Sequence, residues 1–137
     1  MTTSASTLTD ALTGHQYLNL ETFRRSGAGV RTPVWFAEDQ GRLYIRTEAE
    51  SGKVKRIRNQ ARVRLAPSDA QGNPKGEWIE ARAQLAPADQ ADLARRLFHK
   101  KYGLQYRGFE TMMKLRRGDW ATIRIDPPSE RHAGGNG

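Results

Sequence analysis

The segment RLYIRTEAESGKVKRIRNQARVRLA, residues 42–66, decides how the fold of this chain is read. Both of its ends alternate apolar and polar side chains, which is the pattern of half-buried β-strands. Between them, Ser51 can cap a helix whose apolar residues Val54 and Ile57 lie three positions apart on one face. The segment therefore predicts a strand, a short helix and a strand, over 42–47, 51–58 and 62–66.

The same alternation continues on both sides of this segment. It predicts further strands over 17–23, 31–37, 77–85 and 120–125. A longer helix is expected from Pro87 to Gly103, and a short one over 107–117. No strand–helix–strand rhythm of the dinucleotide-binding kind is present. We therefore expect one mainly β domain over 10–126, whose six strands would lose their exposed edges by closing into a small barrel.

Length and composition exclude several classes of protein. The 137 residues correspond to a single domain, with a flexible N-terminus over 1–9 and a disordered tail over 127–137. The chain has no cysteine, which excludes a disulfide scaffold, a thiolate zinc site and a cysteine nucleophile. No apolar run reaches the length of a membrane helix, and the N-terminus lacks the pattern of a secretory signal. We expect a cytoplasmic protein that does not enter a membrane.

The charge balance points to an anionic partner. Lys and Arg number 23 against 15 Asp and Glu, a net charge of +8. Two windows, 42–64 and 95–117, hold 16 of these 23 basic residues. The three histidines, by contrast, share no spacing typical of metal ligands, and we expect no metal site. These histidines are His15, His99 and His132.

The start of the short helix is the strongest candidate for an anion site. A first helical turn normally favours acidic residues, because the helix N-terminus is partially positive. The charged residues of this turn are all basic: Lys53, Lys55 and Arg56. With the Ser51 hydroxyl as a cap, and with Arg46 and Thr47 at the end of the preceding strand, the turn predicts a phosphate site.

The motifs found so far occur in an order that resembles a known family. They are TFRRSG (22–27), RTPVWF (31–36), LYIRT (43–47), SGKVKRIR (51–58) and VRLAP (63–67). This series resembles the branch of the pyridoxamine 5′-phosphate oxidase-like proteins that uses the deazaflavin coenzyme F420. The resemblance extends over about residues 17–125, nearly the whole expected domain.

The resemblance implies a six-stranded split β-barrel of the FMN-binding type, in a homodimer with cofactor sites between the subunits. The cofactor is F420 in this branch and FMN in the oxidase branch. The positions that match the family's phosphate site are Arg46, Thr47, Ser51, Gly52 and Lys53. Those that match the wall beside the cofactor ring are Leu20, Thr22, Pro33, Val34 and Trp35. Further contacts are expected from Lys55 and Arg58 to an acidic cofactor tail and from Trp78 to the ring.

The activity implied by the resemblance is hydride transfer from reduced F420 to a small molecule with a conjugated or electron-poor double bond. No catalytic residue follows from the motifs, and Tyr44, Tyr102 and Tyr106 are candidates for a proton donor by residue type alone. Three alternatives stay open: an F420-binding protein without catalysis, an FMN-binding oxidase of the same fold, and a basic β-barrel that binds nucleic acid. The last rests on Tyr44 between Arg42 and Arg46, and on Trp120 near Arg124.

Overall fold

The computed structural model describes residues 5–115 and 119–128. Its strands form one antiparallel sheet in the order β2-β1-β5-β6-β7-β4-β3. The strands are β1 (Tyr17–Phe23), β2 (Gly29–Trp35), β3 (Ala37–Asp39), β4 (Arg42–Glu48), β5 (Arg62–Ser68), β6 (Ile79–Leu85) and β7 (Trp120–Asp126). The helices are α1 (Ala5–Leu12), α2 (Gly52–Asn59), α3 (Ala88–Tyr102) and α4 (Leu104–Leu115).

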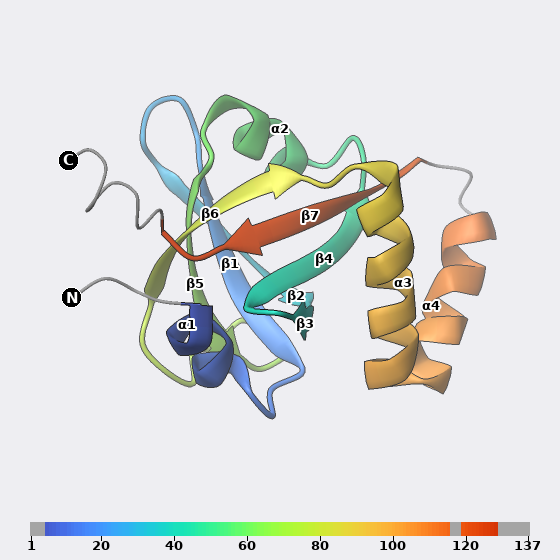
Figure 1. Ribbon diagram of the computed structural model, residues 1–137. Coiled ribbons are helices and arrows are strands. Elements are labelled where there is room, and N and C mark those ends of the chain that lie inside the picture. The colour runs from blue at the N-terminus through green and yellow to red at the C-terminus, as the bar shows by residue number, and fades with distance from the viewer. Residues whose placement is uncertain (1–4, 116–118, 129–137) are drawn as a thin grey trace.

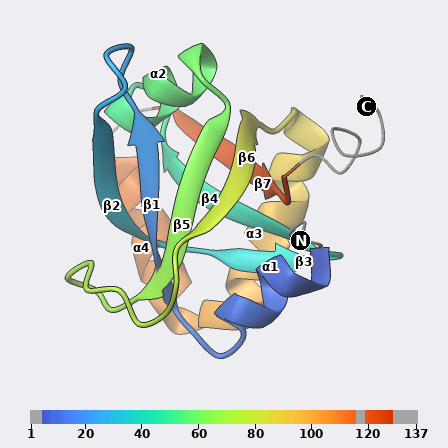
Figure 2. The same cartoon turned by 90° about the vertical axis from the view of Figure 1, so that its left-hand side faces the viewer.

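The sheet curls into a half-barrel that the helices close (Figure 1). Helix α2 covers one end of the curl and contacts β1 and β6, while α1 lies at the opposite end against β4 and β5 (Figure 2). Helices α3 and α4 pack on each other outside the curl, on the side of β3, β4 and β7. None of the helices in the described residues is long and apolar enough to cross a membrane.

Strand β4 separates two apolar cores, because successive side chains of a strand point to opposite faces of the sheet. Leu43 and Ile45 are fully buried in the interior of the curl, together with Leu18 and Leu20 of β1. Tyr44, which lies between them in the sequence, belongs instead to a second core beneath α3 and α4. The members of this second core are Ala37, Tyr44, Ala94, Phe98, Tyr102 and Tyr106.

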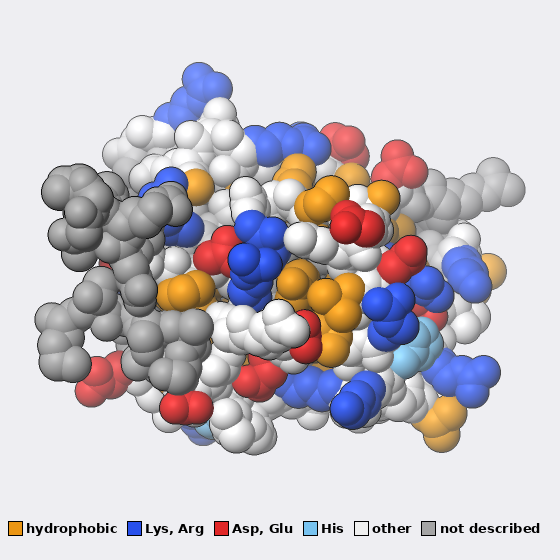
Figure 3. Space-filling view, in the orientation of Figure 1, with side chains coloured by type: hydrophobic (Ala, Val, Ile, Leu, Met, Phe, Trp, Pro, Cys, Tyr) orange, Lys and Arg blue, Asp and Glu red, His pale blue; other side chains and the backbone are white. Residues whose placement is uncertain are grey.

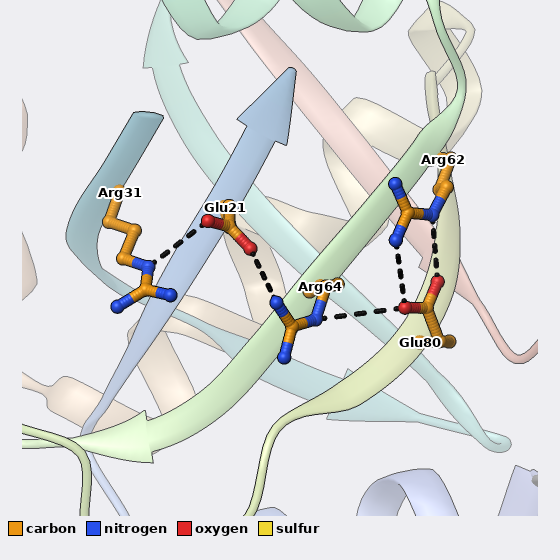
Figure 4. A network of polar contacts seen from close by, with 5 residues as sticks. All are labelled: Glu21, Arg31, Arg62, Arg64 and Glu80. Atoms are coloured by element: carbon orange, nitrogen blue, oxygen red, sulfur yellow. Dashed lines mark hydrogen bonds and ion pairs between the residues drawn. The ribbon is translucent and has the colours of Figure 1, made fainter. Parts of the chain in front are cut away.

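The outer face of the sheet carries a row of charges across four strands (Figure 4). The carboxylate of Glu21 is buried between Arg31 and Arg64, at 3.1 Å from each. Arg64 also lies 3.6 Å from Glu80, which in turn makes two hydrogen bonds with Arg62. The row connects the edge strand β2 with the centre of the sheet, so the outer face is polar where the inner face is apolar.

The predicted mainly β architecture is confirmed, but the sheet has seven strands where six were expected. The apolar run Pro33–Ala37 reads as one strand, and the structure divides it at Phe36 into β2 and β3. The backbone N–H of Phe36 donates to the Tyr102 hydroxyl instead of to a neighbouring strand. Strand β3 then pairs with β4 across a turn in which Gln40 and Gly41 both have positive φ, 52° and 80°.

The ends of the chain also differ from the expectation. Residues 5–9 were expected to be flexible, but the structure places them in α1, where Leu8 and Leu12 are fully buried. The helix expected over 107–117 begins earlier, at Leu104. Most of the tail expected over 127–137 lies outside the described residues, as do positions 116–118 of that helix.

Replacing Leu20 with alanine should lower the free energy of unfolding by about 2–5 kcal/mol, because the substitution leaves a cavity in the interior core. Urea unfolding measures this loss. The matched control is Lys55→Ala on α2, where the side chain is exposed and the change should be small. Equal effects of the two substitutions would contradict the assignment of Leu20 to the core.

Candidate functional site

The first turn of α2 gathers basic side chains and hydroxyl groups between the ends of β1 and β4. The Ser51 hydroxyl accepts a hydrogen bond from the Val54 N–H and caps the helix. Lys53 donates to the hydroxyl of Thr47 at the end of β4, at 3.3 Å. Arg56 donates to the hydroxyl of Thr22 at the end of β1, at 2.6 Å. We call Thr22, Thr47, Ser51, Lys53 and Arg56 the cationic cluster.

The positive charges of this cluster are not neutralised within the described part of the chain. No described carboxylate lies within ion-pair distance of Lys53 or Arg56. Burial lowers the pKa of Lys53, and the charge of Arg56 lowers it further, while the charge of Glu48 opposes this shift. Burial and the nearby Arg24 lower the pKa of Arg56 in the same way. An anion bound here would stabilise both charged forms.

Arg56 was missing from the predicted site residues, while Lys55 and Arg58 were expected there. The structure leaves Lys55 and Arg58 exposed on the outside of α2 and turns Arg56 toward the sheet. The spacing contains a signal that could have found Arg56, because residues three apart lie on the same side of a helix. Arg56 follows Lys53 by three positions and shares its side.

An aromatic cavity of about 310 Å³ lies at the free edge of β2. Among the described residues, its wall is almost entirely apolar, and Arg46 is the single charged residue in it. The lining residues are Tyr17, Pro33, Val34, Trp35, Arg46, Phe98 and Phe109. Four of them were predicted site residues, namely Pro33, Val34, Trp35 and Arg46. The other three come from β1, α3 and α4, whose packing against β2 is not visible in any local motif.

Trp35 is the best-anchored residue of this wall. Its ring stacks on that of Tyr102, with centroids 4.6 Å apart and an interplanar angle of 9°. Phe109 and Tyr17 contact it from two further sides, at centroid distances of 5.8 and 6.3 Å. The position of Trp35 is therefore fixed by packing, which favours a preformed binding wall.

Arg46 and Thr47 were predicted to serve one phosphate site, but the structure places them on opposite faces of β4. Thr47 points to the interior side, toward Lys53. Arg46 shares the other face with Tyr44 and donates to the Thr122 hydroxyl of β7 at 2.9 Å. The chain thus brings Thr47, Ser51, Gly52 and Lys53 together at α2, whereas Arg46 belongs to the aromatic cavity.

Three other predicted residues have different surroundings. Leu20 is fully buried in the interior core and its side chain does not line the cavity. The Thr22 hydroxyl is already engaged by Arg56. Trp78 lies on the outer face, where the guanidinium groups of Arg31 and Arg64 are 4.4 and 5.3 Å from its ring.

A second, more polar cavity of about 230 Å³ lies beside the N-terminal segment. Its lining residues are Gly14, His15, Gln16, Glu38, Lys101, Tyr102 and Gln105. The Lys101 ammonium donates to the Phe36 carbonyl at 2.9 Å and lies 3.5 Å from the centre of the Phe36 ring. Burial lowers the pKa of Lys101 to about 8, and the charge of Glu38 opposes this shift.

Comparison with known proteins identifies the fold of this chain but no close relative. No family model matches the sequence, and no curated protein resembles it closely enough to count as a match. Solved structures match over most of the chain. A candidate pyridoxamine 5′-phosphate oxidase from Listeria innocua is 17% identical, with a TM-score of 0.56 over 91% of this chain and 94% of the other. The chain has the pyridoxamine 5′-phosphate oxidase-like fold.

The same fold occurs in solved structures of proteins with different roles. An FAD-binding protein from Mesorhizobium loti is 19% identical, with a TM-score of 0.62 over 94% of this chain and 91% of that one. The heme storage protein HutZ from Vibrio cholerae is 12% identical, with a TM-score of 0.67 over 94% and 92%. The Agrobacterium tumefaciens protein Atu2129, of unknown function, is 16% identical with a TM-score of 0.68 over 91% of this chain. This chain spans about half of Atu2129, 53% of its length. These likenesses establish the fold alone.

The lowered pKa of Lys101 should make its contribution to stability depend on pH. Its pKa is about 8 in the folded chain and about 10.4 in an unfolded one. Between these values the unfolded state binds more protons, so this contribution to the free energy of unfolding rises from pH 8 to pH 10.

Urea unfolding of the wild type and of Lys101→Met at pH 7, 8, 9 and 10 measures this effect. The free energy of unfolding of the wild type minus that of the variant should increase as the pH rises. A constant difference between the two proteins across this range would contradict the lowered pKa.

Proposed function

We propose that this protein binds a flavin-type cofactor, coenzyme F420 with FMN as the alternative, and transfers a hydride from it to a small conjugated acceptor. One observation carries the proposal: Lys53 in the first turn of α2 and Arg56 one turn later are half-buried, donate to strand-end hydroxyls and have no described carboxylate partner. Such a set of donors is suited to a phosphate group. The fold supports a flavin-type cofactor, as does the similarity to an FAD-binding protein from Mesorhizobium loti.

The cationic cluster fits the phosphate group in its chemistry. Lys53 supplies an ammonium group, Arg56 a guanidinium, and the capped helix start supplies free backbone N–H groups at Gly52 and Lys53. A Cβ at Gly52 would approach the Arg56 guanidinium to 2.7 Å, so a larger residue here would make the Arg56 side chain shift. The residues that would hold the phosphate are therefore Thr47, Ser51, Gly52, Lys53 and Arg56.

The side chains of Pro33, Val34 and Trp35 would form the wall beside the cofactor ring and keep water from its reactive face. When bound, the cofactor supplies the hydride, and the protein supplies binding and orientation. None of the three tyrosines considered as proton donors is among the residues that line the cavity. Tyr44 is 3% exposed, the Tyr102 hydroxyl is bonded to Phe36 and Gln16, and burial raises the pKa of Tyr106. We therefore assign the proton to solvent.

The choice of F420 over FMN rests on the family resemblance and on charge. F420 carries an acidic tail in addition to its phosphate, and the basic side chains of the chain extend well beyond the cationic cluster. They gather over α3 and α4 (Figure 3), where Arg96 and Lys100 are exposed. Arg95 is less available, because it pairs with Asp92 and Glu110.

In the structure, the two aromatic rings on which the nucleic-acid alternative rests are not exposed for stacking on bases. Tyr44, which was expected to stack on a base, is buried in the core beneath α3 and α4. The Trp120 ring packs on Phe109, and its indole nitrogen is buried. Neither ring is available on a basic strand face, so the positive charge is better explained by a small anionic cofactor.

Cofactor binding should depend on Lys53. The purified chain should bind F420 more tightly than FMN, and Lys53→Gln should weaken F420 binding by about 1.5–3 kcal/mol, the range for a hydrogen bond to a charged group. Fluorescence titration measures both. Lys55→Gln on the exposed side of α2 is the matched control and should change binding little. Stronger binding of FMN would favour the oxidase alternative, and equal binding by both variants would refute the phosphate site.

Oxidation of reduced F420 on addition of a quinone or an enone distinguishes an enzyme from a cofactor-binding protein. The rate should increase when the wild-type protein is present. Truncating Trp35 should lower this rate more than it lowers the binding of a generic polyanion such as heparin. An unchanged rate beside tight F420 binding would identify a binding protein without catalysis.

We further propose a homodimer, with cofactor sites completed by the second subunit. Leu104, Met112 and Leu115 lie on one side of α4 with exposures of 80, 48 and 78%, which is unusual for large apolar residues of a monomer. Light scattering should give twice the chain mass of 15.4 kDa. The double variant Leu104→Gln, Leu115→Gln should shift the protein toward monomer at micromolar concentration, and Lys114→Gln on the same helix should not. A wild-type monomer that binds cofactor would contradict the shared site.

A further inference from the structure

Arg46 is a cation in an aromatic wall, and the described residues leave its charge unpaired. Its Nη1 donates to the Thr122 hydroxyl, while its Nε is buried without a hydrogen-bond partner. No described carboxylate lies within ion-pair distance of it. A guanidinium in apolar surroundings is costly unless an anion compensates it. The cavity that Arg46 lines is therefore incomplete without a negatively charged group.

The shape and chemistry of the wall restrict what that group can be. The side chains around Arg46 include four aromatic rings, those of Tyr17, Trp35, Phe98 and Phe109. Flat rings are complementary to a flat, conjugated ligand, which gains from stacking and from burial of its apolar area. The volume of about 310 Å³ is at the lower end of the range for small-molecule sites, roughly 300–1,000 Å³.

A carboxylate matches this charge better than a phosphate does. One guanidinium presents a planar pair of N–H groups that fits a carboxylate in two parallel hydrogen bonds. A phosphate dianion would need further donors, and the remaining wall offers almost none. The cationic cluster on the other face of β4, with its ammonium, guanidinium and hydroxyl groups, is the site with the donors for a phosphate.

We propose that the aromatic cavity binds a planar conjugated carboxylate, with its ring on the Phe98 and Phe109 side, opposite the wall assigned to the cofactor ring, and its carboxylate at Arg46. The proposal rests on the function proposed above in one respect: if the protein transfers a hydride, the acid bound in this cavity is the molecule that accepts it. This assigns the acceptor class as an acid with a conjugated carbon–carbon double bond. One carbon of that bond takes the hydride and the other takes a proton from solvent, and Arg46 selects for the charge of the acid.

The first experiment uses the cofactor-free wild-type chain and three small probes. Calorimetric titration compares 2-naphthoate with 2-naphthamide, which is flat but neutral, and with decahydro-2-naphthoate, which is charged but not flat. The naphthoate should bind at least tenfold more tightly than either of the others. Equal binding of naphthoate and naphthamide, equal binding of naphthoate and its decahydro form, or no naphthoate binding at millimolar concentration would each overturn the proposal.

The second experiment assigns the effect to Arg46. Arg46→Gln should lose at least tenfold in naphthoate affinity and keep its affinity for naphthamide. Lys55→Gln, which removes an exposed cation outside the cavity, should bind naphthoate as the wild type does. A loss in Lys55→Gln equal to that in Arg46→Gln would overturn the proposal. Should Arg46→Gln unfold in the urea assay, the comparison of probes on the wild type decides.

Titrating the same proteins with F420 and FMN separates this inference from the proposed function. Arg46-dependent naphthoate binding without any cofactor binding would leave the carboxylate site standing and refute the function. Cofactor binding without naphthoate binding would refute the carboxylate site and leave the proposed function standing.

Discussion

The hydroxyl of Tyr102 fixes the backbone at Phe36, where the chain passes from one edge of the sheet to the other. It accepts a hydrogen bond from the Phe36 N–H at 3.0 Å and lies within hydrogen-bond distance of the carbonyl groups of Phe36 and Gln16. Phe36 is the single residue between β2 and β3, which form the two edges of the sheet. A side chain thus satisfies the backbone groups that leave the ladder, which a buried backbone requires. Because the two edges are one residue apart in the chain, the sheet has to curl.

Tyr102 also fixes the position of Trp35 in the wall of the aromatic cavity. Trp35 directly precedes Phe36 and stacks on the ring of Tyr102, so the turn of the chain and the position of the indole depend on one residue of α3. Lys101, the neighbour of Tyr102, adds a hydrogen bond to the Phe36 carbonyl. Three contacts with Trp35 and Phe36 thereby fix helix α3 to the edge of the sheet. A cavity with walls held in this way does not need to form on binding, which lowers the entropic cost of taking up a ligand.

The sequence predicts the parts of the structure that local pattern determines. Alternation locates the strands, and Ser51 with Val54 and Ile57 locates α2 to within one residue at its ends. The break at Phe36 could not be found in this way, because the run Pro33–Ala37 is apolar throughout and the residue that breaks it lies 66 positions away. Likewise, Phe98 and Phe109 reach the cavity through the packing of α3 and α4, for which the sequence offers no local signal.

The separation of Arg46 from Thr47 follows from strand alternation alone. Adjacent positions on a strand point to opposite faces, so two neighbours at the end of β4 cannot serve one small anion with their side chains. The structure accordingly divides the positive charge into two environments. Lys53 and Arg56 lie among hydroxyl groups, where several donors can share a multiply charged phosphate. Arg46 lies alone among aromatic rings, where only a single negative charge on a largely apolar molecule can be accommodated. One step along β4 therefore separates a site for a polar, highly charged group from a site for a flat and weakly charged one.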